Sequence, residues 1–302
     1  MNQENFSAPQ SREDVVKRPV CLITGATEGV GKATTLELAK KGFTIVIAAR
    51  SANKAEALKG EVETSTGNSA DFIVADLASL RQVRQLAQTF RRRYTTLDVL
   101  INNAGIFLPT RIETEDGYEM MYQVNYLSHF LLARLLLEEL KKSEQGRIIN
   151  LSSSMYSVGK FDAGNLQSEK HFSVLGTYAA TKLFMLMFTE ELATRLRSTT
   201  VTANAVHPGI VRTRMMLQAP GALRVVSYLS LPFSISPENA ARTSVYLASS
   251  PDVKGVSGQY FTSSKRKEAR NKFDTAENRA LLWELSLKST QEDAVTNLRR
   301  AG

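Results

Sequence analysis

The sequence predicts an α/β fold with one domain, in which helices cover both faces of a doubly wound parallel sheet. Short apolar runs typical of buried strands alternate with helical stretches along most of the chain. A glycine-rich turn joins the first apolar run to the first helix. The 302 residues, of which 43% are hydrophobic, suffice to bury the core of such a domain.

The first strand–turn–helix unit occupies residues 20–41. Residues 20–23 are rich in β-forming side chains, and a helical pattern that begins near Val30 ends in two lysines and a glycine. The intervening turn, 24–31, has the glycine spacing G-x-x-x-G-x-G. Glycines let a pyrophosphate approach the backbone, and the N–H groups at the helix start attract an anion. Taken alone, this loop is equally compatible with an ordinary strand-to-helix connection that binds no nucleotide, and the motifs further along the chain distinguish the two.

The remaining elements continue the alternation, which requires parallel strands with right-handed crossovers. Strands are expected at 43–50, 71–77, 97–102, 147–152, 201–206 and 259–261, and helices at about 52–64, 80–93, 117–142, 176–197, 237–248 and 273–287. We expect a flexible N-terminal arm at 1–18, the domain at 19–290 and a tail at 291–302. A substrate lid is expected at about 210–236, where an apolar stretch has no clear period.

Charge and hydropathy exclude several partners. The net charge is +8, but the basic residues are scattered apart from 91–93 and 265–267, which we interpret as solvated faces rather than a nucleic-acid site. The first 17 residues lack the apolar region of a secretory signal, and no apolar run reaches the about 20 residues of a spanning helix. We therefore expect a cytoplasmic protein without a transmembrane segment, while peripheral contact with a membrane stays open.

The cysteine and histidine content argues against a metal site. Cys21 is the single cysteine, which excludes an intrachain disulfide and a cysteine-rich metal site. The three histidines, His129, His171 and His207, lie far apart without ligand spacing. We therefore expect no bound metal.

Several motifs in order resemble the short-chain dehydrogenase/reductase family. The turn at 24–31 matches T-G-x-x-x-G-x-G, 102–105 matches N-N-A-G, and 178–182 matches Y-x-x-x-K. The match covers about residues 18–262 and includes His207-Pro208-Gly209. The residues 165–170, the long insert after Ser153 and the ending at 257–261 resemble the retinol-dehydrogenase-like branch, with plant-type protochlorophyllide reductases more distant. The resemblance implies a single Rossmann-type domain.

The resemblance also implies a catalytic tetrad, which consists of Asn125, Ser153, Tyr178 and Lys182. Tyr178 and Lys182 share one helix face, so the ammonium is expected to lower the phenol pKa and let Tyr178 act as general acid/base. Ser153 would orient and polarise the substrate oxygen, with Ser152 and Ser154 as alternatives. Asn125 either holds a water beside Lys182 in a proton relay or is a buried polar residue satisfied by backbone.

The cofactor contacts implied by the resemblance come from the glycine turn, the ends of several strands and the segment after His207. They are Gly25, Thr27, Glu28, Gly29, Val30, Gly31, Arg50, Asp76, Leu77, Asn103, Ala104, Gly105, Tyr178, Lys182, Pro208, Gly209, Val211 and Thr213. Asp76 has an alternative role, as the cap of the helix that starts near Ser79.

Arg50 decides the expected cofactor. It ends the second strand, where an NAD-selecting enzyme carries Asp or Glu, and its guanidinium suits a 2′-phosphate. NADP(H) is therefore expected ahead of NAD(H). Two observations oppose this: Glu28 places a negative charge nearby, and Arg50 is compatible with a simple surface position.

These features together predict an NADP(H)-dependent oxidoreductase that transfers hydride between nicotinamide and a small alcohol, aldehyde or ketone. The apolar lid favours a hydrophobic substrate, such as a retinoid, steroid or lipid aldehyde, although it would equally suit simple packing. The rival is a non-catalytic NADP-binding regulator or scaffold of the same fold. A hydrolase triad at Ser153 is disfavoured because no G-x-S-x-G surrounds it. The resemblance leaves open a homodimer through the helices around Asn125 and Tyr178.

Overall fold

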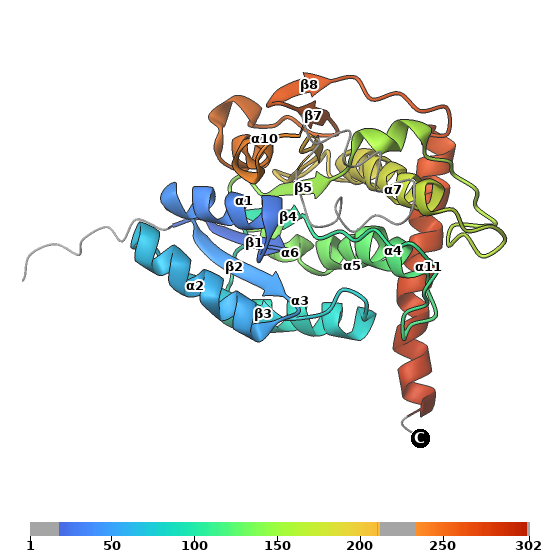
Figure 1. Cartoon of the computed structure of the whole chain (residues 1–302), viewed down its shortest axis with the longest axis horizontal. Coiled ribbons are helices and arrows are strands. Elements are labelled where there is room, and N and C mark those ends of the chain that lie inside the picture. Colours follow the sequence, from blue (N-terminus) through green and yellow to red (C-terminus); the bar gives the residue numbers. More distant parts are fainter. Residues whose placement is uncertain (1–17, 210, 212–233, 301–302) are drawn as a thin grey trace, which may run out of the picture.

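The computed structural model of the chain describes residues 18–209, 211 and 234–300, with side chains as far as residue 290 (Figure 1). The predicted N-terminal arm up to residue 17 lies outside the described residues. So does most of the predicted lid, including Thr213.

The described strands form one sheet in the order β3-β2-β1-β4-β5-β6-β7-β8. Their bounds are β1 Val20–Thr24, β2 Thr44–Ala49, β3 Ala70–Val74, β4 Val99–Asn102, β5 Arg147–Leu151, β6 Thr202–His207, β7 Tyr260–Thr262 and β8 Lys265–Lys267. Neighbours are parallel from β3 to β7, and β8 is antiparallel. This doubly wound order reverses between β1 and β4, where such sheets bind ligands at the carboxyl ends of the strands. The predicted fold class is confirmed.

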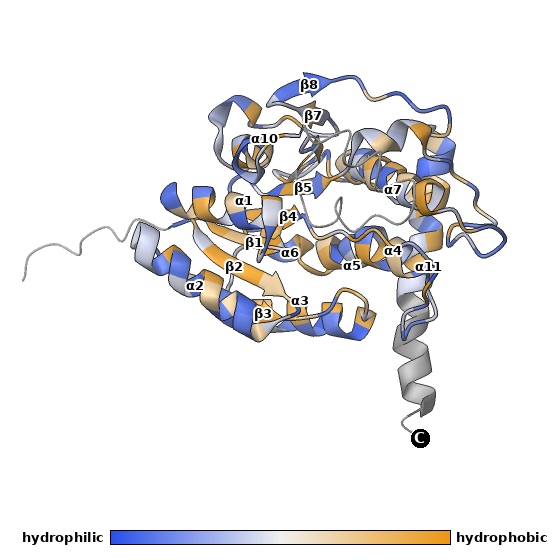
Figure 2. Ribbon diagram, viewed as in Figure 1, coloured by the Kyte–Doolittle hydropathy of each residue, from blue (hydrophilic) through white to orange (hydrophobic). Residues whose placement is uncertain are grey.

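Helices cover both faces of the sheet. Successive side chains of a strand point to opposite faces, so each face presents apolar side chains for helices to cover. Leu22 and Val46 pack with α3 (Leu80–Arg93), α5 (Ser128–Leu135), α7 (Val174–Arg195) and α11 (Ala276–Arg300). Cys21 and Ile23 pack instead with α1 (Gly29–Lys40), α2 (Ala52–Thr66) and α10 (Pro237–Ser249). Figure 2 shows the hydrophobic β1 and β2 between these layers and the hydrophilic β8 at the edge. No helix in the described part of the chain is long and apolar enough to cross a membrane.

Four of the helices begin at serine caps, and their contrast with α1 concerns the site. Ser51, Ser79, Ser173 and Ser236 accept N–H groups at the starts of α2, α3, α7 and α10 over 3.3–3.4 Å. At the start of α1 the corresponding residue, Glu28, makes no side-chain capping bond. The first N–H groups of α1 are thus available to an anionic ligand.

Three elements differ from the sequence prediction. The expected helix at 117–142 is divided into α4 (Met120–Tyr122), a π-helical turn (Gln123–Leu127), α5 and α6 (Leu137–Lys141). Strand β8 was not predicted; it pairs with β7 through a tight turn in which Ser263 and Ser264 have φ of 50° and 57°. The closing helix α11 continues to Arg300, through residues predicted as a tail, and its last turns extend beyond the rest of the domain (Figure 1).

Helix α11 packs along α7 through aromatic contacts. The Trp283 ring lies edge-on to Phe130, with centroids 5.0 Å apart, and stacks on Phe188 at 6.1 Å. Arg195 covers the Trp283 ring at 4.4 Å, and the Tyr126 hydroxyl is 2.7 Å from Ser286 Oγ. An intrachain helix therefore occupies part of the face through which the resemblance suggested a homodimer. The homodimer itself stays a prediction.

Candidate active site

The motif residues meet at the carboxyl ends of the parallel strands. The glycine turn follows β1, N-N-A-G ends β4 and continues beyond it, Ser153 follows β5 and His207 ends β6. Because these strands are parallel neighbours, their ends form one edge of the sheet. Helix α7, which carries Tyr178 and Lys182, packs beside β5 and β6 at this edge.

The glycines of the turn cannot be replaced without strain or a clash. Gly25 and Gly29 have φ of 63° and 54°, which other residues rarely adopt. A Cβ atom on Gly31 would lie 2.2 Å from the Gly25 carbonyl oxygen and 2.5 Å from Asn103 Nδ2. The turn therefore presses directly on the N-N-A-G segment. Together with the uncapped start of α1, it fits the pyrophosphate of a dinucleotide.

Thr24 and Asn103 lock the turn to N-N-A-G. Thr24 Oγ1 accepts the N–H groups of Asn103 and Ala104, each at 3.0 Å. The Asn103 amide in return donates to the carbonyls of Thr24 and Gly25 at 2.8 and 3.0 Å. The Asn103 side chain thus holds backbone in place, and a cofactor would meet the backbone of this segment.

The structure shows the surroundings of two charged side chains that bear on cofactor choice, Glu28 and Arg50. Glu28 forms an ion pair with Lys54, at the start of α2, so its negative charge is offset within the chain. Arg50 is exposed and forms no hydrogen bond or ion pair with any residue that the structure describes. The guanidinium is therefore available to a ligand.

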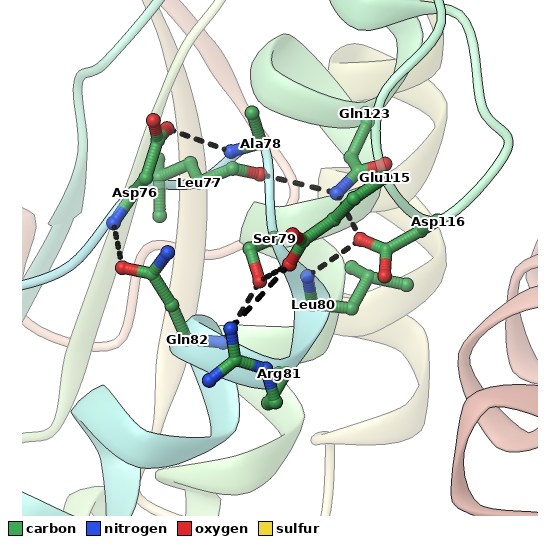
Figure 3. Close-up of polar contacts among 10 residues, drawn as sticks. All are labelled: Asp76, Leu77, Ala78, Ser79, Leu80, Arg81, Gln82, Glu115, Asp116 and Gln123. Carbon is green, nitrogen blue, oxygen red and sulfur yellow. Dashed lines mark hydrogen bonds and ion pairs between the residues drawn. The ribbon is translucent and has the colours of Figure 1, made fainter. Parts of the chain in front are cut away.

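Asp76 organises the turn that precedes α3 (Figure 3). Its carboxylate accepts the Ala78 N–H at 2.9 Å, and its own N–H donates to Gln82 Oε1 at 3.0 Å. The cap of α3 is Ser79, so the alternative that Asp76 caps this helix is wrong. The buried Leu77 carbonyl accepts from Gln123 at 3.4 Å and from Ser128 at 2.6 Å.

The loop after β4 is fastened to the start of α3 by two carboxylates (Figure 3). Asp116 Oδ2 accepts the Leu80 N–H and the Gln123 side-chain amide, each at 2.7 Å. Glu115 bonds to Ser79 Oγ. Sequence reasoning missed this clamp, because the contacts join residues 36 positions apart.

Ser153, Tyr178 and Lys182 form the reactive group of the site. The Ser153 hydroxyl acts on the Tyr178 phenol and lowers its pKa, against the larger effect of burial. Lys182 Nζ donates to the Leu151 carbonyl at 3.0 Å and lies 5.6 Å from the Tyr178 ring centroid. Ser152 is buried and donates to the Lys182 carbonyl at 2.8 Å, while Ser154 is exposed. Of the three candidate serines, Ser153 is the one whose hydroxyl affects the Tyr178 pKa.

Burial controls the protonation of this group. It raises the pKa of Tyr178 to about 12, against a smaller lowering by the bond from Ser153. It also lowers the pKa of Lys182 to about 8. The expectation that the Lys182 ammonium, together with bound nicotinamide, lowers the Tyr178 pKa stays a prediction, because these shifts are those of the chain without a cofactor. Loss of solvation by the charged form is the largest cause of both shifts.

Asn125 lies in the π-helical turn and binds backbone at both ends of its amide. Its oxygen accepts the Ile106 N–H at 2.7 Å, and its nitrogen donates to the Ile106 carbonyl at 2.9 Å. The same nitrogen is 3.3 Å from Thr181 Oγ1. These contacts agree with a buried amide satisfied by backbone. A Cβ on Gly105 would be 3.6 Å from both Asn125 Oδ1 and Lys182 Nζ, so the two groups flank that glycine.

Other predicted and unpredicted residues complete the site. Phe107 was not predicted; its ring lies edge-on to Tyr178, with centroids 5.3 Å apart, two residues after the motif glycine. Gly209 has a φ of 95°, and Val211 pairs with Ile235 as an isolated bridge. Among the described residues, Pro208, Gly209 and Val211 follow the β6 carboxyl end as expected. No group of His, Cys, Asp and Glu in the described parts could hold a metal ion.

Comparison with known proteins identifies the family. The sequence profile of the family described as short chain dehydrogenase matches residues 19–221. The chain belongs to the short chain dehydrogenase family. It is 40% identical to human retinol dehydrogenase 14 over 282 residues, which cover 88% of this chain and 84% of that protein. Human retinol dehydrogenase 12 is 39% identical over 272 residues, with the same two coverages of 88% and 84%.

Solved structures give the same fold. An uncharacterised protein from Mycobacterium paratuberculosis is 28% identical with a TM-score of 0.71, covering 90% of this chain and 93% of that one. Membership of the short chain dehydrogenases makes this protein an oxidoreductase that acts on alcohol or carbonyl groups with a nicotinamide cofactor. The resemblance to retinol dehydrogenases found in the sequence is confirmed.

Proposed function

We propose that this dehydrogenase uses NADP(H) and acts on a hydrophobic alcohol or carbonyl compound, with Tyr178 as general acid/base. The meeting of Ser153, Tyr178 and Lys182 at the carboxyl end of β5 carries the proposal. A protein that only bound a nucleotide would need the glycine turn but not this group of Ser153, Tyr178 and Lys182. The rival reading, a regulator or scaffold without chemistry, leaves the group unexplained.

In carbonyl reduction, Tyr178 and Ser153 have separate roles. The nicotinamide supplies the hydride when bound. Tyr178 holds its proton at neutral pH, because its pKa is about 12, and can donate it to the carbonyl oxygen. Ser153 directs its hydroxyl to the same place and stabilises the developing negative charge. In alcohol oxidation Tyr178 must first lose its proton, which a Lys182 ammonium favours.

The proposed choice of NADP(H) rests on the exposed Arg50. Its guanidinium offers paired, charge-assisted bonds to a 2′-phosphate. Glu28, which would repel that phosphate, is already paired with Lys54. The substrate class rests on the half-buried Phe107 beside Tyr178 and on the relatives, which are named retinol dehydrogenases.

An NADPH-oxidation screen tests the proposal with all-trans-retinal, a steroid ketone, decanal and benzaldehyde. We expect turnover of at least one apolar carbonyl and a fall of at least about 10²-fold in Tyr178→Phe, the loss typical of a removed general acid. NADPH affinity, followed by its fluorescence, should stay within a few-fold. Tyr246→Phe on α10 is the matched control. No turnover of any substrate, or a tenth of the rate in Tyr178→Phe, would disprove this assignment.

A further inference from the structure

His129 is a buried histidine in α5 that the reaction chemistry above does not use. Its side chain is 0% exposed and contacts two of the site segments. Nε2 lies 3.0 Å from Thr24 Oγ1, at the start of the glycine turn. Nδ1 lies 3.4 Å from the backbone carbonyl of Asn125, in the π-helical turn. One imidazole thus joins the cofactor side of the site to the helix that faces Lys182.

The contacts of Thr24 determine where the imidazole proton sits. Thr24 Oγ1 already accepts N–H groups from Asn103 and Ala104, so both lone pairs are occupied. Its own hydrogen can go to His129 Nε2 at 3.0 Å or to the Ile101 carbonyl at 3.4 Å, and the shorter contact is the stronger. Nε2 is then an acceptor.

The opposite nitrogen must consequently carry the proton. Nδ1 faces a carbonyl, which can only accept, so an Nδ1–H group satisfies both contacts at once. Burial, with a smaller contribution from the Lys182 charge, lowers the pKa of His129 to about 3. The ring therefore stays neutral, with one donor and one acceptor in fixed positions.

We propose that His129, as the neutral Nδ1–H tautomer, is a positioning residue that couples the glycine turn to the Asn125 turn. Through Thr24 it fixes the junction of the glycine turn with N-N-A-G, where the cofactor would bind. Through the Asn125 carbonyl it fixes the amide that clamps Ile106. That clamp sets the backbone beside Lys182. The catalytic part of this inference rests on the function proposed above.

The tautomer is tested by long-range ¹H–¹⁵N correlation NMR on the full chain. The chain has three histidines, so a His129→Gln spectrum identifies the signal. We expect a pyrrole-like Nδ1, a pyridine-like Nε2 and no titration between about pH 5.5 and pH 8.5. An Nε2–H tautomer, or titration in this range, would overturn the proposal. This measurement requires no turnover.

Two variants separate the two bonds. His129→Gln retains an acceptor near the Nε2 position and loses the Asn125 contact, whereas His129→Asn retains a donor near Nδ1 and loses Thr24. We expect His129→Gln to lower kcat about tenfold, equivalent to about 1.4 kcal/mol, with NADPH affinity within twofold. We expect His129→Asn to weaken NADPH binding about tenfold, with kcat at saturating NADPH within twofold of the wild type.

Thr189→Val is the matched control, since Thr189 is 0% exposed on α7 and bonds to Asn150 away from the reactive group. It should lower the melting temperature without changing kcat or NADPH affinity. If both His129 variants behave like this control, His129 is merely structural and the proposal fails. If the wild type turns over nothing, the proposed function fails, while the NMR and NADPH titrations still decide the role of His129.

Discussion

The two halves of the site use different physical means. On the side of β1 and β2, the important features are glycines without side chains and exposed charges, with Glu28 and Lys54 each about half exposed. On the side of β5 and α7, the important groups are side chains held by backbone, such as Lys182 on the Leu151 carbonyl. The backbone conformation of the glycine turn shapes the half beside β1 and β2, whereas contacts with buried backbone position the side chains of the half beside β5 and α7.

This difference predicts how each half responds to change. Exposed charges are solvated and screened, so removing one changes the free energy of unfolding little and chiefly affects the binding of a ligand that contacts it. Buried polar groups have no water to replace a lost partner, so their removal costs more. Variants of the buried half should therefore change rates strongly, and variants of the exposed half should change affinity moderately.

The largest effect is expected for Ser153→Ala. Loss of one donor to a developing oxyanion lowers kcat by about 10²–10³-fold, and NADPH affinity should remain unchanged. Steady-state kinetics with the best carbonyl of the screen measures it. Ser152→Ala breaks only the bond to the Lys182 carbonyl, so it should chiefly lower stability, by about 1–3 kcal/mol. A larger kcat loss in Ser152→Ala than in Ser153→Ala would reverse the assignment.

Gly31→Ala should have the next largest effect. The new Cβ would lie 2.2 Å from the Gly25 carbonyl oxygen, so the turn must shift. Overpacking of up to about 3 kcal/mol would weaken NADPH about 100-fold in a fluorescence titration. Gly60→Ala is the control, because a Cβ there meets nothing within 4 Å. Equal NADPH affinity in both variants would show that the turn tolerates side chains.

Arg50→Ala tests the exposed half. Charge-assisted bonds contribute roughly 1.5–3 kcal/mol, so NADPH should weaken about 10- to 100-fold while NADH hardly changes. Arg92→Ala removes an exposed charge at the end of α3 and should alter neither. If the wild type prefers NADH, or if both cofactors weaken alike in Arg50→Ala, the role of Arg50 is refuted.

The smallest expected effect concerns stability on the outer side of α7. Burial, and next the Asp274 charge, raise the pKa of Glu190 to about 7. The folded state therefore keeps a proton that the unfolded state releases from about pH 4.5, and stability falls between about pH 4.5 and pH 7. In Glu190→Gln the free energy of unfolding should decrease by about 1 kcal/mol less between these two pH values than in the wild type, as measured by urea unfolding at each pH. Parallel pH curves for the two proteins would contradict the shift.

The sequence predicted well what depends on local pattern. Helix α3 has the predicted bounds, because serine at its start and three arginines in its last turn mark both ends. The order of motifs also placed the fold class correctly, since parallel strands bring their carboxyl ends together. Strand β8 had no such signal: it is short and charged, and its turn uses Ser263-Ser264 instead of the usual Asn-Gly.

What the sequence could not predict depends on contacts between distant segments. The pairing of Glu28 with Lys54 requires α2 to start beside α1, and the Asp116 clamp requires the β4 loop to reach α3. The raised pKa of Tyr178 in the chain alone has no sequence signal for the same reason. Spacing on a helix reveals that Lys182 is near, but only the packed structure reveals how much water is lost from both groups.

Helix α11 has a consequence for protein synthesis. Every strand of the sheet precedes it in the sequence, so the ribosome delivers α5 and α7 before Trp283 exists. During that interval Phe130 and Phe188 lack the ring that later covers them, and such exposed apolar surface promotes aggregation and chaperone binding. A premature stop codon at the start of α11 would leave Tyr178 and Lys182 intact in the nascent polypeptide. It would nevertheless yield a chain in which Phe130 and Phe188 are never covered by Trp283.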